Sequence, residues 1–433
     1  MHAILIQDVS PVITWSNEMQ KKLIFALLLV YSGACFSFDW VPERRKEQNP
    51  TQPAHLIVPL PYSKPGIGEG VILLGTLTNV AGTTADISGL FVGGDAEGTI
   101  LNGAEIPLYS DVLFLDFYLQ DIDKAAVKNY SIRGINNTGE NDFKIMDISV
   151  AEESRFDLNL TFFERRLNFY YSYFKFEYQI TAFRDIDRTL ITTLGEPFVN
   201  SGDTNSFGVS IDLTDDYLDS RKGVRFDVTY QDHKANTLKE AEFYTLDYNL
   251  LGYIPMRNSD TLVLNYYQSD AHVTRKGVTD PASIRAELNS NCASTDTQCL
   301  TTEQELVDNF ISARTNGTST TLGGDLRLRS FPQMRYQGAH TAFIGAEYRW
   351  NISQEVKPFD YFIWKDVRTG LQVAFFAEIG TVAETSSKLW DETRYSVGTG
   401  LRLVAGSGAV YRADIATGDE GVELIVIFDY PWE

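Results

Sequence analysis

Apolar and polar residues alternate without a break along the stretch Val224-Arg225-Phe226-Asp227-Val228-Thr229-Tyr230-Gln231. Successive side chains of a β-strand point to opposite faces, so one face of this segment is apolar while the other carries charged and polar groups. A strand that faces lipid on one side and water on the other shows this pattern over about ten residues. The stretch therefore predicts a strand of a transmembrane β-barrel.

The same alternation recurs along much of the chain. It is found in residues 156–162, 207–213, 395–403 and 422–430. A soluble β-sandwich also alternates. However, these strands are long, and their polar faces hold charged side chains in mid-strand, which is typical of a wet lumen. The pattern favours the membrane barrel over the sandwich.

Aromatic residues gather at several expected strand ends, as they do in the interfacial girdles of membrane barrels. They are Tyr348, Trp350, Tyr361, Phe362, Trp364, Tyr430 and Trp432. Their positions predict contact with the membrane interfaces.

The expected strands number sixteen, and bacterial single-chain barrels have an even number. They cover residues 66–79, 85–94, 111–121, 125–135, 143–153, 156–165, 168–183, 204–213, 222–232, 243–255, 260–273, 342–352, 371–384, 393–405, 408–416 and 421–430. With both ends of the chain in the periplasm, the connection over about residues 274–341 is extracellular, and a connection of this length is usually functional. The predicted fold is all-β: a 16-stranded antiparallel transmembrane β-barrel with one long extracellular loop.

The beginning of the chain has the pattern of a secretory signal peptide: a short cationic head, the apolar run 23–30 and small residues after it. The apolar run is shorter than the roughly 20 residues that a membrane-spanning helix needs. Met19 is the better start, which makes the residues before it an upstream extension. Cleavage is expected after Ser37 or after Ala34, and the second site would leave Cys35 as the first mature residue.

The chain is therefore expected to have three parts. Residues 1–37 are the signal peptide with its upstream extension, residues 38–65 are a polar, Pro-containing periplasmic segment, and residues 66–433 are the barrel. After residue 37 no apolar run approaches the length of a membrane-spanning helix. A mature chain in a membrane would therefore cross it as strands.

The composition argues against several classes of protein. The net charge is −21, and Lys and Arg form no repeating cluster, which argues against nucleic-acid binding. Hydrophobic residues make up 43% of the chain, which is too much for a disordered protein. None of the five His is spaced from a Ser or Asp in a way that would support nucleophilic or water-activating chemistry. We expect no enzymatic activity and no cofactor.

Two cysteines, Cys292 and Cys299, lie in a polar stretch of the long loop. In an oxidising compartment they could close a small disulfide loop. A metal site is the weaker interpretation, because no His lies nearby and two thiols do not complete a tetrahedral shell. We therefore predict a disulfide and no metal.

The long loop ends in a motif that resembles one family of membrane barrels. Gly323-Gly324 is followed by Leu328-Arg329-Ser330-Phe331. This resembles the Gly-Gly…Val-Arg-Gly-Phe/Tyr motif of the BamA/TamA superfamily (the bacterial surface antigen family) of outer-membrane assembly and secretion barrels. Ser330 stands where that motif has a glycine, so a positive φ there would be more costly than in the family.

Three further segments resemble the same family, in the same order. They are residues 212–223, 376–380 and 398–414. The resemblance covers residues 204–433 well and the preceding strands mainly through their spacing. The POTRA domains that precede the barrel in the insertases and secretion pores are not found, so the chain resembles the barrel-only branch.

The resemblance implies that the long loop folds back into the lumen and that its arginine meets an acidic residue of the inner wall. Lipid-type residues take the odd positions of 371–379, so Glu378 is expected to point inward. The same count places Glu347, Gly400 and Arg402 on the inner wall.

A guanidinium in a narrow lumen is costly unless a carboxylate meets its planar fork. The resemblance and the alternation together predict a bridge between Arg329 and Glu378 that pins the loop. Glu347 is the alternate partner.

The resemblance implies a barrel in the bacterial outer membrane that aids insertion or translocation of a polypeptide or other substrate. Its expected partners are outer-membrane lipid and unfolded outer-membrane or secreted polypeptides, and the barrel itself is expected to be a monomer. Incoming strands would pair at a weak seam between residues 66–79 and 421–430, since the glycines of the first segment weaken strand pairing.

The alternative is a passive pore or a structural barrel. The expected lumen holds both acidic and basic residues, which would favour neither sign of ion strongly.

Overall fold

The computed structural model describes most of the chain after residue 52. The described residues are 53–136, 142–216, 219–235, 237–257, 260–353, 359–361, 364–367, 369–405, 410–428 and 430–432. The predicted signal peptide with its two cleavage sites, and residues 38–52 of the predicted periplasmic segment, lie outside these residues.

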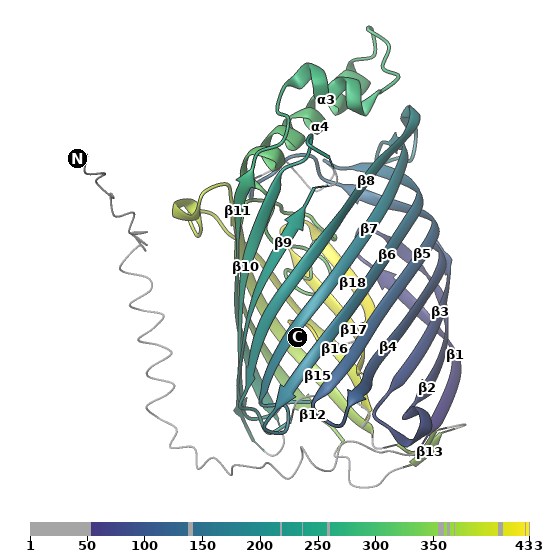
Figure 1. Ribbon diagram of the computed structural model, residues 1–433, viewed down its shortest axis with the longest axis vertical. Helices are drawn as coiled ribbons and strands as arrows, with labels where there is room; N and C mark the ends of the chain where they lie inside the picture. Colours follow the sequence, from purple (N-terminus) through teal and green to yellow (C-terminus); the bar gives the residue numbers. More distant parts are fainter. Residues whose placement is uncertain are drawn as a thin grey trace, which may run out of the picture. The chain divides into compact units, whose positions relative to one another are not determined.

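Within them, sixteen strands close into one antiparallel barrel (Figure 1). The strands are β1 (Ala54–Lys64), β2 (Gly68–Thr78), β3 (Asp86–Gly94), β4 (Glu97–Tyr109), β5 (Leu113–Asn129), β6 (Lys144–Phe162), β7 (Leu167–Arg184), β8 (Leu190–Asp212), β9 (Gly223–Lys234), β10 (Glu242–Pro255), β11 (Thr261–Arg275), β12 (His340–Asn351), β15 (Thr369–Ala383), β16 (Arg394–Ala405), β17 (Val410–Gly418) and β18 (Gly421–Phe428). Strands that follow one another in the chain are neighbours in the wall, and β1 meets β18 to close the ring. The predicted fold class is confirmed.

Three kinds of smaller element join the strands. They are the two-stranded sheet of β13 (Phe359–Tyr361) and β14 (Trp364–Val367), the short turns η1 (Val80–Gly82) and η2 (Ser386–Lys388), and the helices α3 (Pro281–Leu288) and α4 (Thr297–Asn316).

The burial of the side chains separates a barrel from a sandwich. Phe226 of β9 is 37% exposed and Leu424 of β18 is 47% exposed, whereas a sandwich would bury both between its sheets. On the opposite face of the wall, Glu378 and Arg402 are buried. The apolar face thus points outward, as a wall in contact with lipid requires.

The number of strands was predicted correctly although two individual strands were missed. The sequence analysis assigned residues 54–64 to the N-terminal segment, but they form β1, so the predicted boundary at residue 66 is wrong. It also missed β4. Pro59 and Pro61 in β1, like the glycines of β4, obscure the alternation, but prolines are tolerated in strands at a sheet edge.

Each of two long strands was predicted as two separate strands. Residues 111–121 and 125–135 belong mainly to β5, and residues 143–153 and 156–165 to β6. Both predicted breaks fall at runs of polar residues, where neither face is apolar. The register between β5 and β6 is the same on both sides of each break, because a strand needs an apolar face only where it touches lipid.

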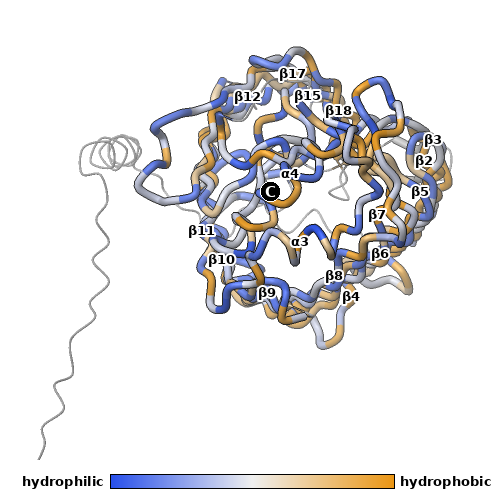
Figure 2. Tube along the Cα trace, turned by 90° about the horizontal axis from the view of Figure 1, so that it is seen from above, coloured by the Kyte–Doolittle hydropathy of each residue, from blue (hydrophilic) through white to orange (hydrophobic). Residues whose placement is uncertain are grey.

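The long connection between β11 and β12 contains the helices α3 and α4, which the sequence analysis did not predict. Asp280 and Asp296 cap their first turns by accepting hydrogen bonds from the backbone N–H groups of Ser283 (2.9 Å) and Cys299 (3.0 Å). From above, both helices lie within the outline of the barrel wall (Figure 2).

No helix among the described residues is long and apolar enough to cross a membrane.

Candidate functional site

The predicted loop motif lies in a closed turn of the chain, residues 322–336, which we call the motif segment. Leu322 and Tyr336 exchange two backbone hydrogen bonds of 2.9 Å and bring the ends of the segment together. Gly323 and Gly324 both have positive φ (101° and 106°), a conformation that glycine adopts without strain. The Gly-Gly pair therefore allows the tight turn that presents the motif.

The motif residues Leu328, Arg329, Ser330 and Phe331 are fully buried. Among these four residues, the positive φ is found at Leu328 (55°) and not at Ser330. Such a conformation costs a residue with a Cβ roughly 1 kcal/mol. The Ser330 backbone N–H donates to the Ser396 hydroxyl of β16 at 2.8 Å, and its side chain fills space left by Gly418, where a Cβ would lie 2.3 Å from Ser330 Oγ.

Arg329 binds three carboxylates of the barrel wall. Its Nε donates to Glu378 Oε1 at 2.8 Å, its Nη1 to Asp414 Oδ2 at 2.8 Å and its Nη2 to Glu347 Oε2 at 3.3 Å. Its backbone N–H also donates to Glu378. The structure thus brings Arg329 together with both residues named from the sequence and with Asp414 of β17, which the sequence analysis missed although the alternation in β17 would have placed it inward.

Three more arginines share these carboxylates. Arg402 and Arg349 donate to Glu347, and Arg412 donates to Asp414 and to the carbonyl oxygen of Asp325 in the motif segment. We call Arg329, Arg349, Arg402, Arg412, Glu347, Glu378 and Asp414 the arginine cluster. With four guanidiniums and three carboxylates, its formal charge is +1.

Small and aromatic residues complete the surroundings of Arg329. A Cβ on Gly400 would lie 1.8 Å from Asp414 Oδ1, so the glycine makes room for that carboxylate. The Arg329 guanidinium stacks 3.3 Å from the centre of the Phe376 ring. Burial alone would lower the pKa of Arg329, but the carboxylates of Glu378, Asp414 and Glu347 hold its pKa above the usual value.

The motif segment also touches the turns on both sides of the junction between β1 and β18. Arg335 donates to Glu420, in the β17–β18 turn, at 2.5 Å. On the other side, the Gln333 N–H donates to the carbonyl oxygen of Pro65 at 2.9 Å, and Lys64 lies 3.7 Å from Asp325. No periodic pattern of residues indicates these contacts, because they depend on how the loop is placed.

Two of the aromatic residues assigned to an interfacial girdle lie elsewhere. Tyr430 and Trp432 are 3% and 1% exposed, so the girdle prediction is wrong for them. Trp350 is exposed on the outward face, as that prediction requires. The sequence could not separate these cases, because periodicity stops at the end of β18 and does not say where the chain turns next.

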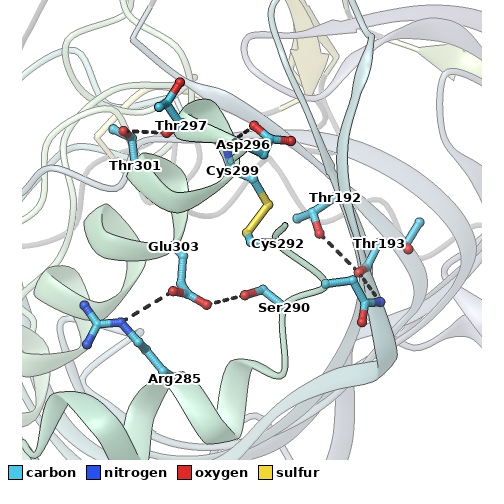
Figure 3. Close-up of a disulfide and its surroundings, with 11 residues drawn as sticks. Thr192, Thr193, Arg285, Ser290, Cys292, Asp296, Thr297, Cys299, Thr301 and Glu303 are labelled. Carbon is cyan, nitrogen blue, oxygen red and sulfur yellow. Dashed lines mark hydrogen bonds and ion pairs between the residues drawn. A yellow bond between two sulfur atoms is a disulfide. The ribbon is translucent and has the colours of Figure 1, made fainter. Parts of the chain in front are cut away.

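Cys292, in the connection after α3, forms a disulfide with Cys299 in the first turn of α4 (Figure 3). Asn291, beside it, donates to the carbonyl oxygen of Thr193 in β8 at 2.9 Å, and Glu303 of α4 accepts a hydrogen bond from Ser290. The disulfide loop therefore sits against the upper part of β8. Among the described residues, no group of three or more His, Cys, Asp or Glu could hold a metal ion.

Replacing both cysteines with serine is expected to lower the local stability of residues 289–302 by about 2 kcal/mol. A cross-link that closes so short a loop removes about that much chain entropy from the opened state. Limited proteolysis of the folded protein should then cut this loop about 30-fold faster, while the temperature at which the barrel denatures on gels stays the same. An unchanged cleavage rate would show that the contacts to β8 hold the loop without the disulfide.

The barrel closes at a strand that the sequence analysis did not expect. It placed the seam between residues 66–79 and 421–430, but the first strand is β1, and β1 pairs with β18. Among the described residues, β1 and β18 share one register position, Ser63 with Val426, whereas β1 and β2 pair along their whole length.

Comparison with known proteins places the barrel in a family. The Omp85 superfamily domain matches residues 115–418. No curated protein matches the chain.

Among solved structures, the chain is similar to BamA from Haemophilus ducreyi lacking POTRA domains 1–3, with 11% identity, a TM-score of 0.48, and coverage of 87% of this chain and 70% of that one. It is also similar to CdiB from Escherichia coli, with 10% identity and a TM-score of 0.48, and here the match covers 87% of this chain and 63% of the CdiB chain. Because the domain match extends over more than half of the sequence, the chain belongs to the Omp85 superfamily.

Proposed function

We propose that this barrel lies in the bacterial outer membrane and aids the insertion or translocation of polypeptides, with the junction of β1 and β18 as the place where an incoming strand pairs. The observation that carries the proposal is the sparse pairing at this junction within a barrel of the Omp85 superfamily. We call the junction the seam.

The sequence of β1 explains why so little of the seam is paired. The Pro61 carbonyl oxygen accepts a hydrogen bond from the Tyr411 hydroxyl at 3.2 Å, so the backbone groups of Pro61 point toward the β18 side. Pro59 has the same orientation, because alternate residues of a strand point the same way. Neither proline has an N–H. In the register set by Ser63 and Val426, Pro61 lies opposite Phe428, the last residue of β18, and Pro59 lies beyond the end of β18, so one donor is missing where the two strands overlap.

An edge with few internal partners can accept another strand. Unpaired backbone groups at a sheet edge form hydrogen bonds with an added strand, and alternate side chains give that pairing its register. Among the residues that the structure describes, β1 is joined across the seam by the Ser63–Val426 pair and by two hydrogen bonds. One runs from the Ser63 hydroxyl to the Leu424 carbonyl oxygen, and the other from the Tyr411 hydroxyl to the Pro61 carbonyl oxygen. Opening the seam therefore breaks far fewer bonds than separating β1 from β2.

A reversible lock tests the seam. Cysteines at the paired positions Ser63 and Val426 would form a disulfide across it, and cysteines at Thr76 and Ser88, whose hydroxyls lie 2.8 Å apart between β2 and β3, provide the matched control. Protein in liposomes would be mixed with an unfolded eight-stranded outer-membrane barrel, and folding of that probe followed on gels.

We expect the oxidised Ser63→Cys/Val426→Cys protein to lose most of the insertion activity and to regain it on reduction, while the Thr76→Cys/Ser88→Cys control stays active. Wild-type protein with and without reductant controls for Cys292–Cys299. If the locked protein inserts the probe as fast as the unlocked one, the seam mechanism is wrong. If wild-type protein does not exceed protein-free liposomes, the barrel is a passive pore or a structural protein.

The expectations that the protein is a monomer and has no enzymatic activity stay predictions.

A further inference from the structure

Residues 430–432, which follow β18, lie in the interior of the barrel, where Tyr430 and Trp432 are buried. The Tyr430 hydroxyl donates to Asp219 Oδ1 at 2.8 Å. Asp219 lies in the connection between β8 and β9, and β8 is eight strands from β18 in the ring of sixteen, halfway round the wall. Asp219 also accepts a hydrogen bond from the Gln372 side chain of β15 at 3.3 Å, so the connection between β8 and β9 folds into the lumen and meets Tyr430 there.

The wall holds Tyr430 from other sides as well. The Tyr430 hydroxyl lies 3.2 Å from Gln372 Oε1 of β15, and the Arg349 guanidinium of β12 stacks 3.8 Å from the centre of its ring. Arg349 also donates to Glu347, so Tyr430 borders the arginine cluster.

Trp432 lies deeper in the same interior. Its indole N–H donates to Glu378 Oε1 at 3.1 Å, and its carbonyl oxygen accepts a hydrogen bond from the Asn249 side chain of β10 at 3.0 Å. A Cβ on Gly345 would lie 2.5 Å from the indole, so this glycine leaves the space that the ring fills. Glu378 is the carboxylate that binds Arg329, so residues 430–432 and the motif segment meet at one side chain.

The interior is filled unevenly. Inward side chains of β12, β15 and β17, such as Glu347, Glu378 and Asp414, are buried under the motif segment and residues 430–432. On the other side of the ring, inward polar side chains such as Asn159 of β6 and Asp227 of β9 are partly exposed. Water therefore reaches parts of this wall, at β6 and β9, whereas inward side chains of β8 such as Ser206 and Ser210 are buried.

We propose that residues 430–432 are a latch: a segment of the chain itself that holds the connection between β8 and β9 inside the lumen, against β12 and β15, and so keeps the passage along β6 to β9 narrow. Tyr430 holds Asp219 of that connection, and Trp432 is anchored at Glu378 and Gly345. Because the latch directly continues β18, a displacement of β18 pulls on it. This proposal concerns the lumen and does not depend on the proposed function.

Conductance in planar lipid bilayers measures the width of the passage. Tyr430→Ala/Trp432→Ala is expected to raise the single-channel conductance at least about twofold over wild type. The matched control is Tyr395→Ala/Trp350→Ala, which removes the same two side-chain types from exposed positions on the outward face. The control should conduct like wild type, and a folded latch variant with wild-type conductance would overturn the proposal.

A cross-linked variant keeps the test decisive if the first variant fails to fold. Cysteines replacing Gly345 and Trp432 would be joined by a short, reducible bis-thiosulfonate linker that holds the latch against β12. We expect low conductance with the linker in place and a rise on reduction, with no such rise for wild-type protein in reductant. Equal conductance before and after reduction would show that the latch does not control the passage.

Discussion

Replacing Arg329 with Ala is expected to lower the free energy of unfolding of the barrel by about 3–5 kcal/mol, the cost of removing one partner from a buried ion pair. The Arg329 guanidinium is shared by three carboxylates, those of Glu378, Asp414 and Glu347. A carboxylate only accepts hydrogen bonds, so each of the three would lose a donor. The truncation also leaves a void beside Phe376, on which the guanidinium stacks. The temperature at which the folded band converts to the unfolded band on gels measures the loss.

Two controls separate the arrangement of Arg329 from its charge. Arg329→Lys keeps the charge but cannot reach three carboxylates with a planar fork, so it should recover only part of the stability. Arg155→Ala removes an exposed arginine that pairs with Asp157 and should change stability by less than about 0.5 kcal/mol. An Arg329→Ala barrel as stable as wild type would show that the motif segment is held by other contacts.

Replacing Glu347 with Gln is expected to destabilise the barrel by a similar amount, again about 3–5 kcal/mol. Glu347 accepts hydrogen bonds from Arg402, Arg349 and Arg329, and its neutral replacement would raise the formal charge of the arginine cluster from +1 to +2. The burial of these groups leaves no water to screen the added repulsion. The same gel measurement applies, with the exposed Glu97→Gln as the matched control.

Combining the two substitutions tests whether the arginine cluster acts as a unit. The Arg329→Ala/Glu347→Gln protein has the wild-type cluster charge of +1, so its loss of stability should be smaller than the sum of the two single losses. Strict additivity would mean that Arg329 and Glu347 contribute separately.

The parts of the fold that face lipid could be predicted from the sequence. The alternation in 224–231 defines β9, and counting positions in 371–379 places Glu378 inward, because the membrane forces apolar side chains onto one face of each strand. Where that constraint is weak, prediction failed: β1 holds prolines, and β5 and β6 contain runs of mostly polar residues, 120–124 and 152–155, that interrupt the alternation.

The site was only partly predictable for a related reason. The pairing of Arg329 with Glu378 followed from a family motif and strand parity, and parity in β17 would also have placed Asp414 inward. The positions of Tyr430 and Trp432 depend instead on how residues 430–432 turn into the interior. Nothing periodic encodes such turns. The helices of the long loop did leave a local signal, since Asp280-Pro281 is a typical helix start, with the cap followed by proline at the first helical position.

The contacts of the motif segment with both flanks of the seam couple the position of that segment to the separation of β1 from β18. Arg335 binds the turn before β18, and Gln333 binds the turn after β1. If the two strands move apart, the motif segment cannot keep both contacts. Thermodynamic linkage makes this coupling reciprocal. A molecule that binds more tightly to the displaced motif segment therefore favours the open seam. A strand bound between β1 and β18 favours displacement of the motif segment by the same coupling free energy.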